Sequence, residues 1–291
     1  MKKLMLTVLA AAQFASTSFA QQQTGVITTA QTGRSEAVTF ESPYRTRGGV
    51  DGAIIGAGVG LSGLGLYLIQ KNKSGPNRAE LDVIDADIEG AKMDVPKFDR
   101  FAAGYYSSNA RTASDFLFYP SFALPFLLLK DEKINRKAGQ VAVLYVETMA
   151  ITGTLFTLTA AHVERKRPLV YNNDPDNKQR SKKHAQNSFY AGHTAAAASA
   201  TFFAAKVFHD FNPDSRARPY IWGAAAAIPA TVGYLRLKAG KHFLSDNILG
   251  YALGASAGIL VPQLHKTKGL ENVSITPLMG LSNGVAATVT F

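Results

Sequence analysis

Six long apolar segments, separated by polar connectors, constrain the fold of this chain more than any other feature of its sequence. Most of them are longer than a typical strand and lack the alternating β-branched pattern of strands, so we expect helices. Apolar helices joined by polar connectors are typical of bundles. We therefore predict an all-α fold, a six-helix bundle, over residues 49–265. The six segments lie at about residues 52–70, 115–129, 141–162, 191–209, 219–235 and 246–264.

Both ends of the chain differ from this central region. Residues 1–20 combine two lysines, an apolar stretch and small residues, which is the pattern of a cleaved secretory signal peptide. Residues 21–48 are rich in Gln, Thr and Ser, and we expect a disordered or extended segment there. Residues 266–291 alternate in polarity around a Ser-Asn-Gly turn, which predicts a short β-hairpin. A strand of an outer-membrane barrel is the alternative, although one hairpin cannot close a barrel.

Composition narrows the range of partners. The chain has no cysteine, which excludes disulfides and cysteine-ligated metal sites. Its net charge of +10 suits nucleic acid, anionic lipid or a phosphorylated substrate. The most basic stretch, residues 164–184, lacks the interleaved aromatic residues of a surface that binds single-stranded nucleic acid. We therefore expect no nucleic-acid partner.

A glycine-rich stretch in the first apolar segment permits two interpretations. Residues 58–63 match the GxGxxG pattern of a dinucleotide-binding turn, but no surrounding βαβ unit is indicated. Gly52, Gly56 and Gly60 repeat every four residues, as on a helix face that packs closely against another helix. We favour the packing interpretation and expect no nucleotide cofactor.

The entrance to the sixth apolar segment carries a guanidinium, an imidazole and a carboxylate. Arg236 precedes His242 by six residues, and Asp246 follows His242 by four. A four-residue spacing places His242 and Asp246 on one face of a helix, where the carboxylate can hold one ring nitrogen and leave the other free to attack. Taken alone, a pair with this spacing is more often a plain hydrogen bond on a helix surface.

Further polar groups lie where other apolar segments end or begin. Arg167 follows the third segment, while Gly192 and His193 open the fourth. In an up-and-down bundle with short connectors, these positions and the start of the sixth segment fall on the same side. Charged and titratable groups should therefore converge there. Four other histidines are interpreted as solvated or capping groups at helix ends or in basic loops: His162, His184, His209 and His265.

Residues 100–262 resemble the superfamily of type 2 phosphatidic acid phosphatases and vanadium haloperoxidases. Its signatures are a Lys seven residues before Arg-Pro, then Pro-Ser-Gly-His, then Ser-Arg with a His six residues after the Arg and an Asp four further on. The order and the intervals agree in this chain, and the family's bundle has the same six-helix layout. The matching residues are Arg167-Pro168, Gly192-His193, Arg236, His242 and Asp246.

The chain departs from these signatures at three places. Ala160 stands where the family has the Lys, Tyr190-Ala191 where it has Pro-Ser, and Leu235 where it has the last Ser. Loss of the Lys and the Ser removes two phosphate contacts, each worth about 1.5–3 kcal/mol. A non-catalytic protein that binds phosphate or lipid is therefore an open alternative. The candidates for replacing the missing cation are Lys166, Lys238 and Lys241.

The resemblance implies a metal-independent histidine phosphatase that uses no cofactor. His242 would attack phosphorus and form a phosphohistidine, with Asp246 orienting its ring. His193 would protonate the leaving oxygen and later activate water. The phosphate oxygens would be bound by Arg167, Arg236 and the Gly192 amide.

The resemblance also suggests what is hydrolysed and where. The expected substrate is a phosphomonoester or a pyrophosphate, lipid-linked rather than soluble, by analogy with the family and from the apolar bundle. The expected location is the bacterial cell envelope, associated with the membrane and with the site facing the periplasm. A soluble periplasmic acid phosphatase and a vanadate-dependent haloperoxidase remain open as other enzymatic functions.

Overall fold

The computed structural model describes residues 41–267, 273–278 and 284–289. The predicted signal peptide at residues 1–20, and residues 21–40 of the segment that follows it, lie outside the described residues. The chain divides into two units at Glu41 and Ser42, and the unit Ser42–Phe291 holds all of the elements below.

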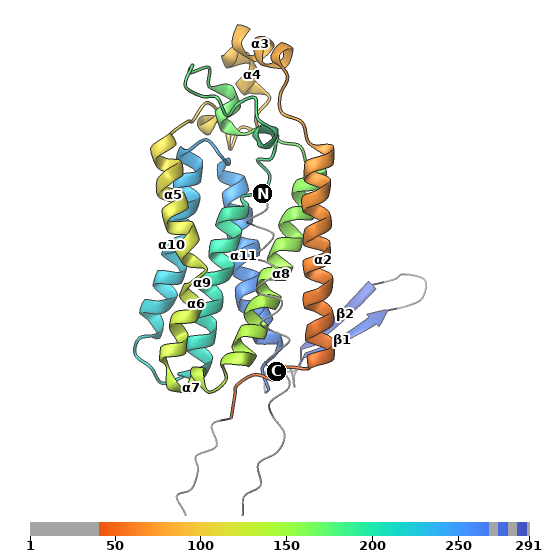
Figure 1. The fold of residues 1–291 in the computed structure, drawn as a ribbon, viewed down its shortest axis with the longest axis vertical. Helices are drawn as coiled ribbons and strands as arrows, with labels where there is room; N and C mark the ends of the chain where they lie inside the picture. Colours follow the sequence, from red (N-terminus) through yellow and green to blue (C-terminus); the bar gives the residue numbers. More distant parts are fainter. Residues whose placement is uncertain (1–40, 268–272, 279–283, 290–291) are drawn as a thin grey trace, which may run out of the picture. The chain divides into compact units, whose positions relative to one another are not determined.

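The described part of the chain is mainly helical, as predicted. Five of the six apolar segments each correspond to one long helix, because each is long enough to bury one face against its neighbours. The second segment, 115–129, is instead divided among α5, α6 and η2. The long helices are α2 (Gly48–Asn72), α5 (Ser108–Ser121), α8 (Ala138–His162), α9 (Gly192–Phe211), α10 (Arg218–Lys238) and α11 (Leu244–Leu264) (Figure 1).

Shorter helices occupy the connectors. The chain bends by 40° between α5 and the α6–η2 pair, and Pro125 lies in the first turn of α6, after the bend. The short α-helices are α3 (Arg78–Ala86), α4 (Ile88–Met93), α6 (Leu124–Leu127) and α7 (Glu132–Asn135). The 3₁₀ helices are η1 (Arg100–Ala102), η2 (Leu128–Lys130), η3 (Pro168–Tyr171) and η4 (Lys183–Gln186).

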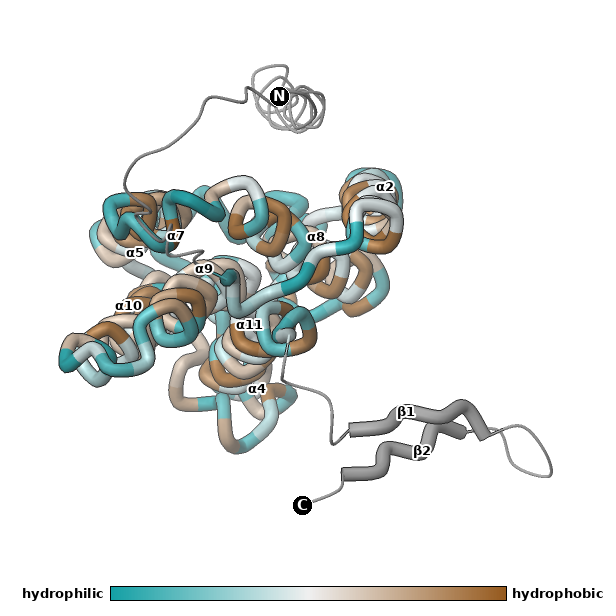
Figure 2. Tube along the Cα trace, turned by 90° about the horizontal axis from the view of Figure 1, so that it is seen from below, coloured by the Kyte–Doolittle hydropathy of each residue, from teal (hydrophilic) through white to brown (hydrophobic). Residues whose placement is uncertain are grey.

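Helix α9 is the central element of the bundle and packs against α8, α10 and α11 (Figure 2). Its alanine-rich sequence leaves most of its side chains buried. On α11, Gly250 and Gly254 face the α9 backbone, where an added Cβ would lie only 2.6 and 2.1 Å from carbonyl oxygens of α9 and its N-cap. Small residues on both helices therefore let the two backbones approach closely.

The glycines of α2 also pack against another helix, but on a different face from the one predicted. An added Cβ at Gly52, Gly56 or Gly60 would meet nothing within 4 Å. At Gly58 it would instead lie 2.9 Å from Ala150 of α8, and Gly65 is packed in the same way against that helix. Helix α2 is apolar all round, so its sequence does not reveal which side faces a partner.

Within the described part of the chain, three helices are long and apolar enough to cross a membrane, namely α2, α8 and α11. The bent pair of α5 with α6–η2 would add a fourth span if it is counted as one. Large apolar side chains are exposed on several of these helices, for example Tyr67, Phe116, Phe126 and Leu260. Exposed apolar surface of this extent marks contact with lipid or a partner, so these features suggest membrane association.

Two strands follow the helices. β1 (Val273–Leu278) and β2 (Gly284–Val289) pair antiparallel, with Val273 opposite Val289 and Leu278 opposite Gly284. Residues 279–283, which include the Ser and Asn of the predicted turn, lie outside the described residues.

Candidate functional site: a cationic cavity at one end of the bundle

Several long helices end or begin at the end of the bundle that carries α3 and α4 (Figure 1). Among these are the N-terminal ends of α5, α9 and α11 and the C-terminal ends of α8 and α10. A cavity of about 400 Å³ lies there. The structure brings four of the predicted site residues to its wall: Arg167, His193, Arg236 and His242.

The two arginines reach the cavity from different elements. Arg236 lies in the last turn of α10, is 4% exposed and forms an ion pair of 3.0 Å with Asp115 of α5. Its Nε is buried without a hydrogen-bond partner among the described residues. The Nε and Nη2 of Arg167 each donate to the Asn187 carbonyl at 3.2 Å. Both guanidinium groups thus have donors available at the cavity.

His242 lies in the short connector between α10 and α11 and is 3% exposed. Its Nδ1 lies 2.6 Å from the Ser188 carbonyl oxygen, an acceptor, so Nδ1 carries the proton. The Nε2 atom of the neutral ring then has a free lone pair. Burial, followed by the charge of Arg167, holds the pKa of His242 well below its ordinary value, so the ring is neutral near pH 7.

Asp246 does not contact His242 as the four-residue spacing predicts. Helix α11 begins at Leu244 with Phe243 as its N-cap, so His242 precedes the helix and shares no helix face with Asp246. The fully buried carboxylate accepts hydrogen bonds from the Phe243 amide at 2.9 Å and the Ser188 hydroxyl at 2.6 Å. Asp246 therefore reaches His242 only through Ser188, whose carbonyl holds the ring.

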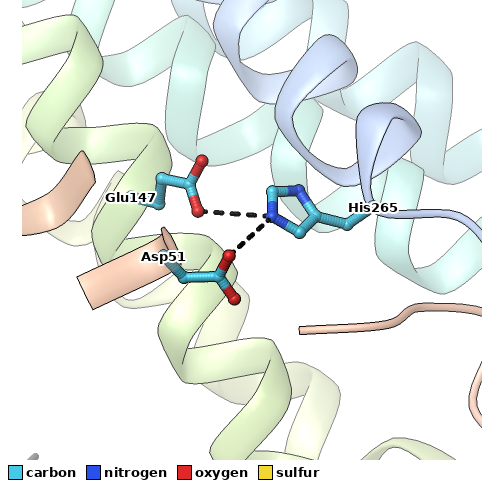
Figure 3. A group of neighbouring side chains, drawn as sticks. All are labelled: Asp51, Glu147 and His265. Atoms are coloured by element: carbon cyan, nitrogen blue, oxygen red, sulfur yellow. Dashed lines mark hydrogen bonds and ion pairs between the residues drawn. The ribbon is translucent and has the colours of Figure 1, made fainter. Parts of the chain in front are cut away.

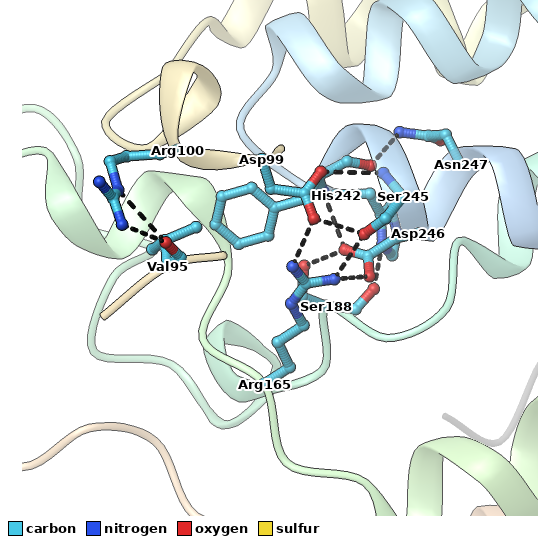
Figure 4. A network of polar contacts seen from close by, with 10 residues as sticks. Val95, Asp99, Arg100, Arg165, Ser188, His242, Ser245, Asp246 and Asn247 are labelled. Carbon is cyan, nitrogen blue, oxygen red and sulfur yellow. Dashed lines mark hydrogen bonds and ion pairs between the residues drawn. The ribbon is translucent and has the colours of Figure 1, made fainter. Parts of the chain in front are cut away.

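A buried network continues beyond Asp246 (Figure 4). Arg165 pairs with Asp246 through Nη1 and with Asp99 through Nη2, the latter at 2.7 Å. The Ser245 amide donates to Asp99 at 2.9 Å. Burial raises the pKa of Asp99, but hydrogen bonds from Ser245 and the charge of Arg165 outweigh burial and lower it. The motifs did not indicate Arg165, Asp99 or Ser188.

Gly192 and His193 open α9, as the sequence predicts for the fourth segment. The His193 ring packs against the Phe118 ring of α5, with centroids 4.2 Å apart. A Cβ at Gly192 would lie 2.6 Å from the ring of Phe156 on α8. The structure therefore explains the glycine by close packing on α8, while its amide lies in the first turn of α9, where backbone N–H groups lack helical partners.

The charge balance of the cavity is strongly positive. Besides the two arginines, Arg111, Lys182 and Lys241 line it, and the single carboxylate among the described lining residues is Asp115. Burial and then Arg236 lower the pKa of Arg167 to about 10. Burial and then Arg167 lower the pKa of Lys241 to about 7. These directions show cations that repel one another, which favours binding of an anion between them.

The three lysines considered as replacements for the missing motif Lys have different surroundings. Ala160 is buried in the last turn of α8 and brings no charge. Lys166 pairs with Glu80 at 2.7 Å, and Lys238 lies 4.9 Å above the Tyr105 ring. Lys241 alone of the three lines the cavity, where its ammonium donates to Gln179.

The motifs did not indicate Arg111, Asp115 and Tyr119, which also line the cavity. They are spaced by four residues and so share one face of α5, a signal that the sequence does contain. His184 also lines the cavity, whereas it was interpreted as a solvated loop residue.

The comparison with protein families agrees with the motifs. The model of the PAP2 superfamily matches residues 141–270, a range that includes Arg167, Gly192-His193, Arg236, His242 and Asp246. Searches of curated proteins and of solved structures found no significant match. The family match confirms, over residues 141–270, the resemblance to this superfamily that was inferred from the motifs.

Proposed function

We propose that this protein is a phosphatase that hydrolyses a phosphomonoester or a pyrophosphate through a phosphohistidine intermediate. The observation that carries the proposal is the wall of one cavity, where the imidazoles of His193 and His242 lie among the cations, which include Arg167, Arg236 and Lys241. A transferring phosphoryl group spreads negative charge over three equatorial oxygens and needs an in-line nucleophile. The match to the PAP2 superfamily supports the same class of reaction.

The neutral His242 ring supplies the nucleophile in this proposal. Its Nε2 attacks phosphorus, the P–O bond to the leaving group breaks, and His193 gives a proton to the leaving oxygen. Burial, followed by the charge of Arg236, lowers the pKa of His193 in the empty cavity, and the negative charge of the bound phosphate favours the protonated ring that this step needs. His193 then takes a proton from water, which attacks phosphorus and breaks the P–N bond. Throughout, the His242 Nδ1–H donates to the Ser188 carbonyl, 2.6 Å away, and Asp246 holds Ser188 in place.

Three cations bind the phosphate oxygens. Arg167 and Arg236 offer planar, permanently charged forks, and the partnerless Nε of Arg236 is available to one oxygen. Lys241 takes the place of the cation that Ala160 lacks, because it is buried at the cavity wall. The Gly192 amide at the start of α9 adds one more donor.

The proposed substrate is lipid-linked. Support comes from the apolar helices α2, α8 and α11, together with the exposed apolar side chains along the bundle. The proposal includes a six-helix bundle over residues 49–265, preceded by a signal at 1–20, in the bacterial envelope with the site facing the periplasm. After an alkaline wash, a membrane-associated phosphatase would stay in the membrane fraction, whereas a soluble periplasmic phosphatase would not. This measurement separates the two alternatives.

Phosphate release tests the catalytic proposal. Purified protein is assayed on phosphatidic acid, undecaprenyl pyrophosphate, lipid A and a soluble phosphomonoester, beside His242→Ala and the exposed-site control His162→Ala. We expect release by wild type and the control and none by His242→Ala. His193→Ala should slow substrates with poor leaving groups most, because they need the proton. Equal rates for His193→Ala and wild type on every substrate contradict the general-acid role.

A non-catalytic protein that binds phosphate or lipid is the second candidate. The observation in its favour is that Ala160 and Ala191 are both buried and carry no polar side-chain atom. In that case purified wild type would bind inorganic phosphate, measured by calorimetry, yet release none from any substrate. Binding without turnover supports this candidate over the phosphatase.

A further inference from the structure

A second cluster of titratable side chains (Figure 3) lies toward the opposite end of the bundle, where α2 begins and α11 ends (Figure 1). Asp51 is in the first turn of α2, Glu147 is on α8, and His265 follows the last residue of α11. Asp51 and Glu147 are each 3% exposed. One ligand atom from each of the three residues lies within 4.8 Å of the other two. The sequence analysis identified no metal site and interpreted His265 as a capping or solvated group.

Neighbouring groups fix the direction of two of these side chains. The Arg47 amide donates to Asp51 Oδ2 at 2.7 Å, which leaves Oδ1 facing the cluster. His265 Nδ1 lies 2.8 Å from the Val261 carbonyl oxygen, so it carries the proton and Nε2 presents a lone pair. The Arg45 amide donates to the His265 carbonyl at 2.7 Å and fixes the backbone there. A hydrogen bond of this kind to the second ring nitrogen is what orients a metal-binding histidine.

The third side chain has an unsatisfied atom. Glu147 Oε2 is buried and has no hydrogen-bond partner in the described part of the chain. It lies 3.5 Å from His265 Nε2, and Asp51 Oδ1 lies 3.4 Å from the same nitrogen. With Nδ1 protonated in the neutral ring, three electron-pair donors face one another across these gaps. Buried acceptors in this arrangement need a positive charge between them.

We propose that Asp51, Glu147 and His265 bind a Zn²⁺ ion. Two ligands about 2.1 Å from zinc at a tetrahedral angle are about 3.4 Å apart, which agrees with both separations from His265 Nε2. Two carboxylates and a divalent cation with a neutral imidazole also sum to zero charge, which a buried site favours.

The donor set separates zinc from the commoner hard cations. Ca²⁺ takes six to eight oxygen ligands at longer distances, and Mg²⁺ keeps an octahedral shell of oxygens with several waters. An imidazole with two carboxylates suits zinc better than either. The ion would join the N-terminal turn of α2 to α8 and to the end of α11, so its role is to stabilise the fold.

Zinc binding by the whole chain in detergent, after treatment with a chelator, tests the site directly. Affinity is measured by competition with a chromophoric chelator, and metal content by mass spectrometry. We expect one Zn²⁺ per chain and a loss of more than about tenfold in affinity in His265→Gln. His162→Gln is the matched control, because His162 Nδ1 also lies 2.8 Å from the carbonyl four residues before it, but the ring is exposed. The control should bind zinc like wild type.

A second variant guards against loss of folding. Glu147→Gln keeps the shape of the side chain but removes its charge, so zinc should raise the melting temperature of wild type and not of this variant. Folded wild type that binds no zinc overturns the proposal and assigns the cluster to an ion pair of protonated His265. Unchanged zinc affinity in both Glu147→Gln and His265→Gln overturns it as well. Neither readout uses turnover, so the result is independent of the phosphatase proposal.

Discussion

The two ends of the bundle carry clusters of side chains with opposite net charge. At one end, arginines and lysines outnumber Asp115 around the cavity. At the other end, Asp51 and Glu147 outnumber His265. Each buried excess calls for a counter-ion, an anion at the first end and a cation at the second. The net charge of +10 describes the whole chain and reveals neither local sign.

The histidines at the two ends share one hydrogen-bond arrangement, although their surroundings differ in charge. Each uses Nδ1 to donate to a carbonyl oxygen, 2.6 Å away for His242 and 2.8 Å away for His265, so that Nε2 of the neutral ring presents its lone pair to the surroundings. The surroundings differ, since His242 lies beside Arg167 and Arg236 while His265 lies beside two carboxylates. A free Nε2 among cations can attack a bound phosphoryl group, whereas a free Nε2 among carboxylates can bind a metal.

Removal of a buried cation from the cavity should have the largest effect of the changes considered, and this effect should appear in kcat/KM. Arg236→Met loses two charge-assisted hydrogen bonds to phosphate, and at about 1.5–3 kcal/mol each this predicts a fall in kcat/KM of about 100- to 10,000-fold. The remaining Asp115 is partly exposed and can be solvated, so the fold should persist. Arg216→Met, at an exposed position between α9 and α10, is the control. A loss below tenfold in Arg236→Met would remove Arg236 from the phosphate site.

Disruption of the hydrogen-bond network behind His242 should lower activity less than removal of a cation, and it should lower kcat more than it changes KM. Asp246→Asn weakens the support of Ser188 and the pairing with Arg165, so we expect kcat to fall about 10- to 100-fold, as for other residues that orient a reacting group. Because Asp246 does not reach the cavity, KM should change little. Breaking a buried ion pair should also lower the free energy of unfolding by about 3 kcal/mol. Rates are measured on the folded fraction, and a change in KM alone would contradict this role.

The pH dependence of anion binding should reveal Lys241. Its pKa of about 7 means that it loses its proton as pH rises above 7 in the empty cavity, while a bound anion favours the charged form. The affinity for sulfate, whose own charge is constant, should therefore fall by up to about tenfold per pH unit above 7. Lys241→Arg keeps its charge, so its sulfate affinity should stay flat. His242, with its lowered pKa, does not titrate in this range. If the sulfate affinities of wild type and Lys241→Arg changed with pH in the same way, Lys241 would be excluded from the site.

The apolar segments predicted the helices well because helix formation depends on local pattern. The segments at 191–209 and 219–235 correspond to α9 and α10 within a few residues. The packing face of α2 was predicted wrongly, because a helix that is apolar all round carries no amphipathic signal. The exact start of a helix was also not predictable from the sequence. Because α11 begins at Leu244, His242 lies outside the helix and does not make the expected contact with Asp246.

Sequence spacing predicted those site residues that belong to motifs and missed those that depend on tertiary packing. Arg167, His193, Arg236 and His242 line the cavity at the expected end of the bundle. The ion pair between Asp99 and Arg165, which lies behind the cavity, joins residues 66 positions apart in the sequence. No local sequence pattern reveals a contact at this separation. The residues of the proposed zinc site are even farther apart in the sequence, since 214 positions separate Asp51 from His265.

Chelation of zinc should have the smallest effect on catalysis, and this prediction tests whether the two ends act separately. Helix α11 has 21 residues, so His242 and His265 lie about 30 Å apart at a rise of 1.5 Å per residue. Changes at such distances usually add independently, so turnover well below the melting temperature should stay within about twofold after EDTA treatment. The melting temperature should fall in the same samples and return when zinc is added. Arg236→Met should show the reverse, a lost turnover with a zinc response like that of wild type. Turnover that disappears with the metal would mean that the reaction itself needs a cation, and the metal-independent histidine mechanism would then be wrong.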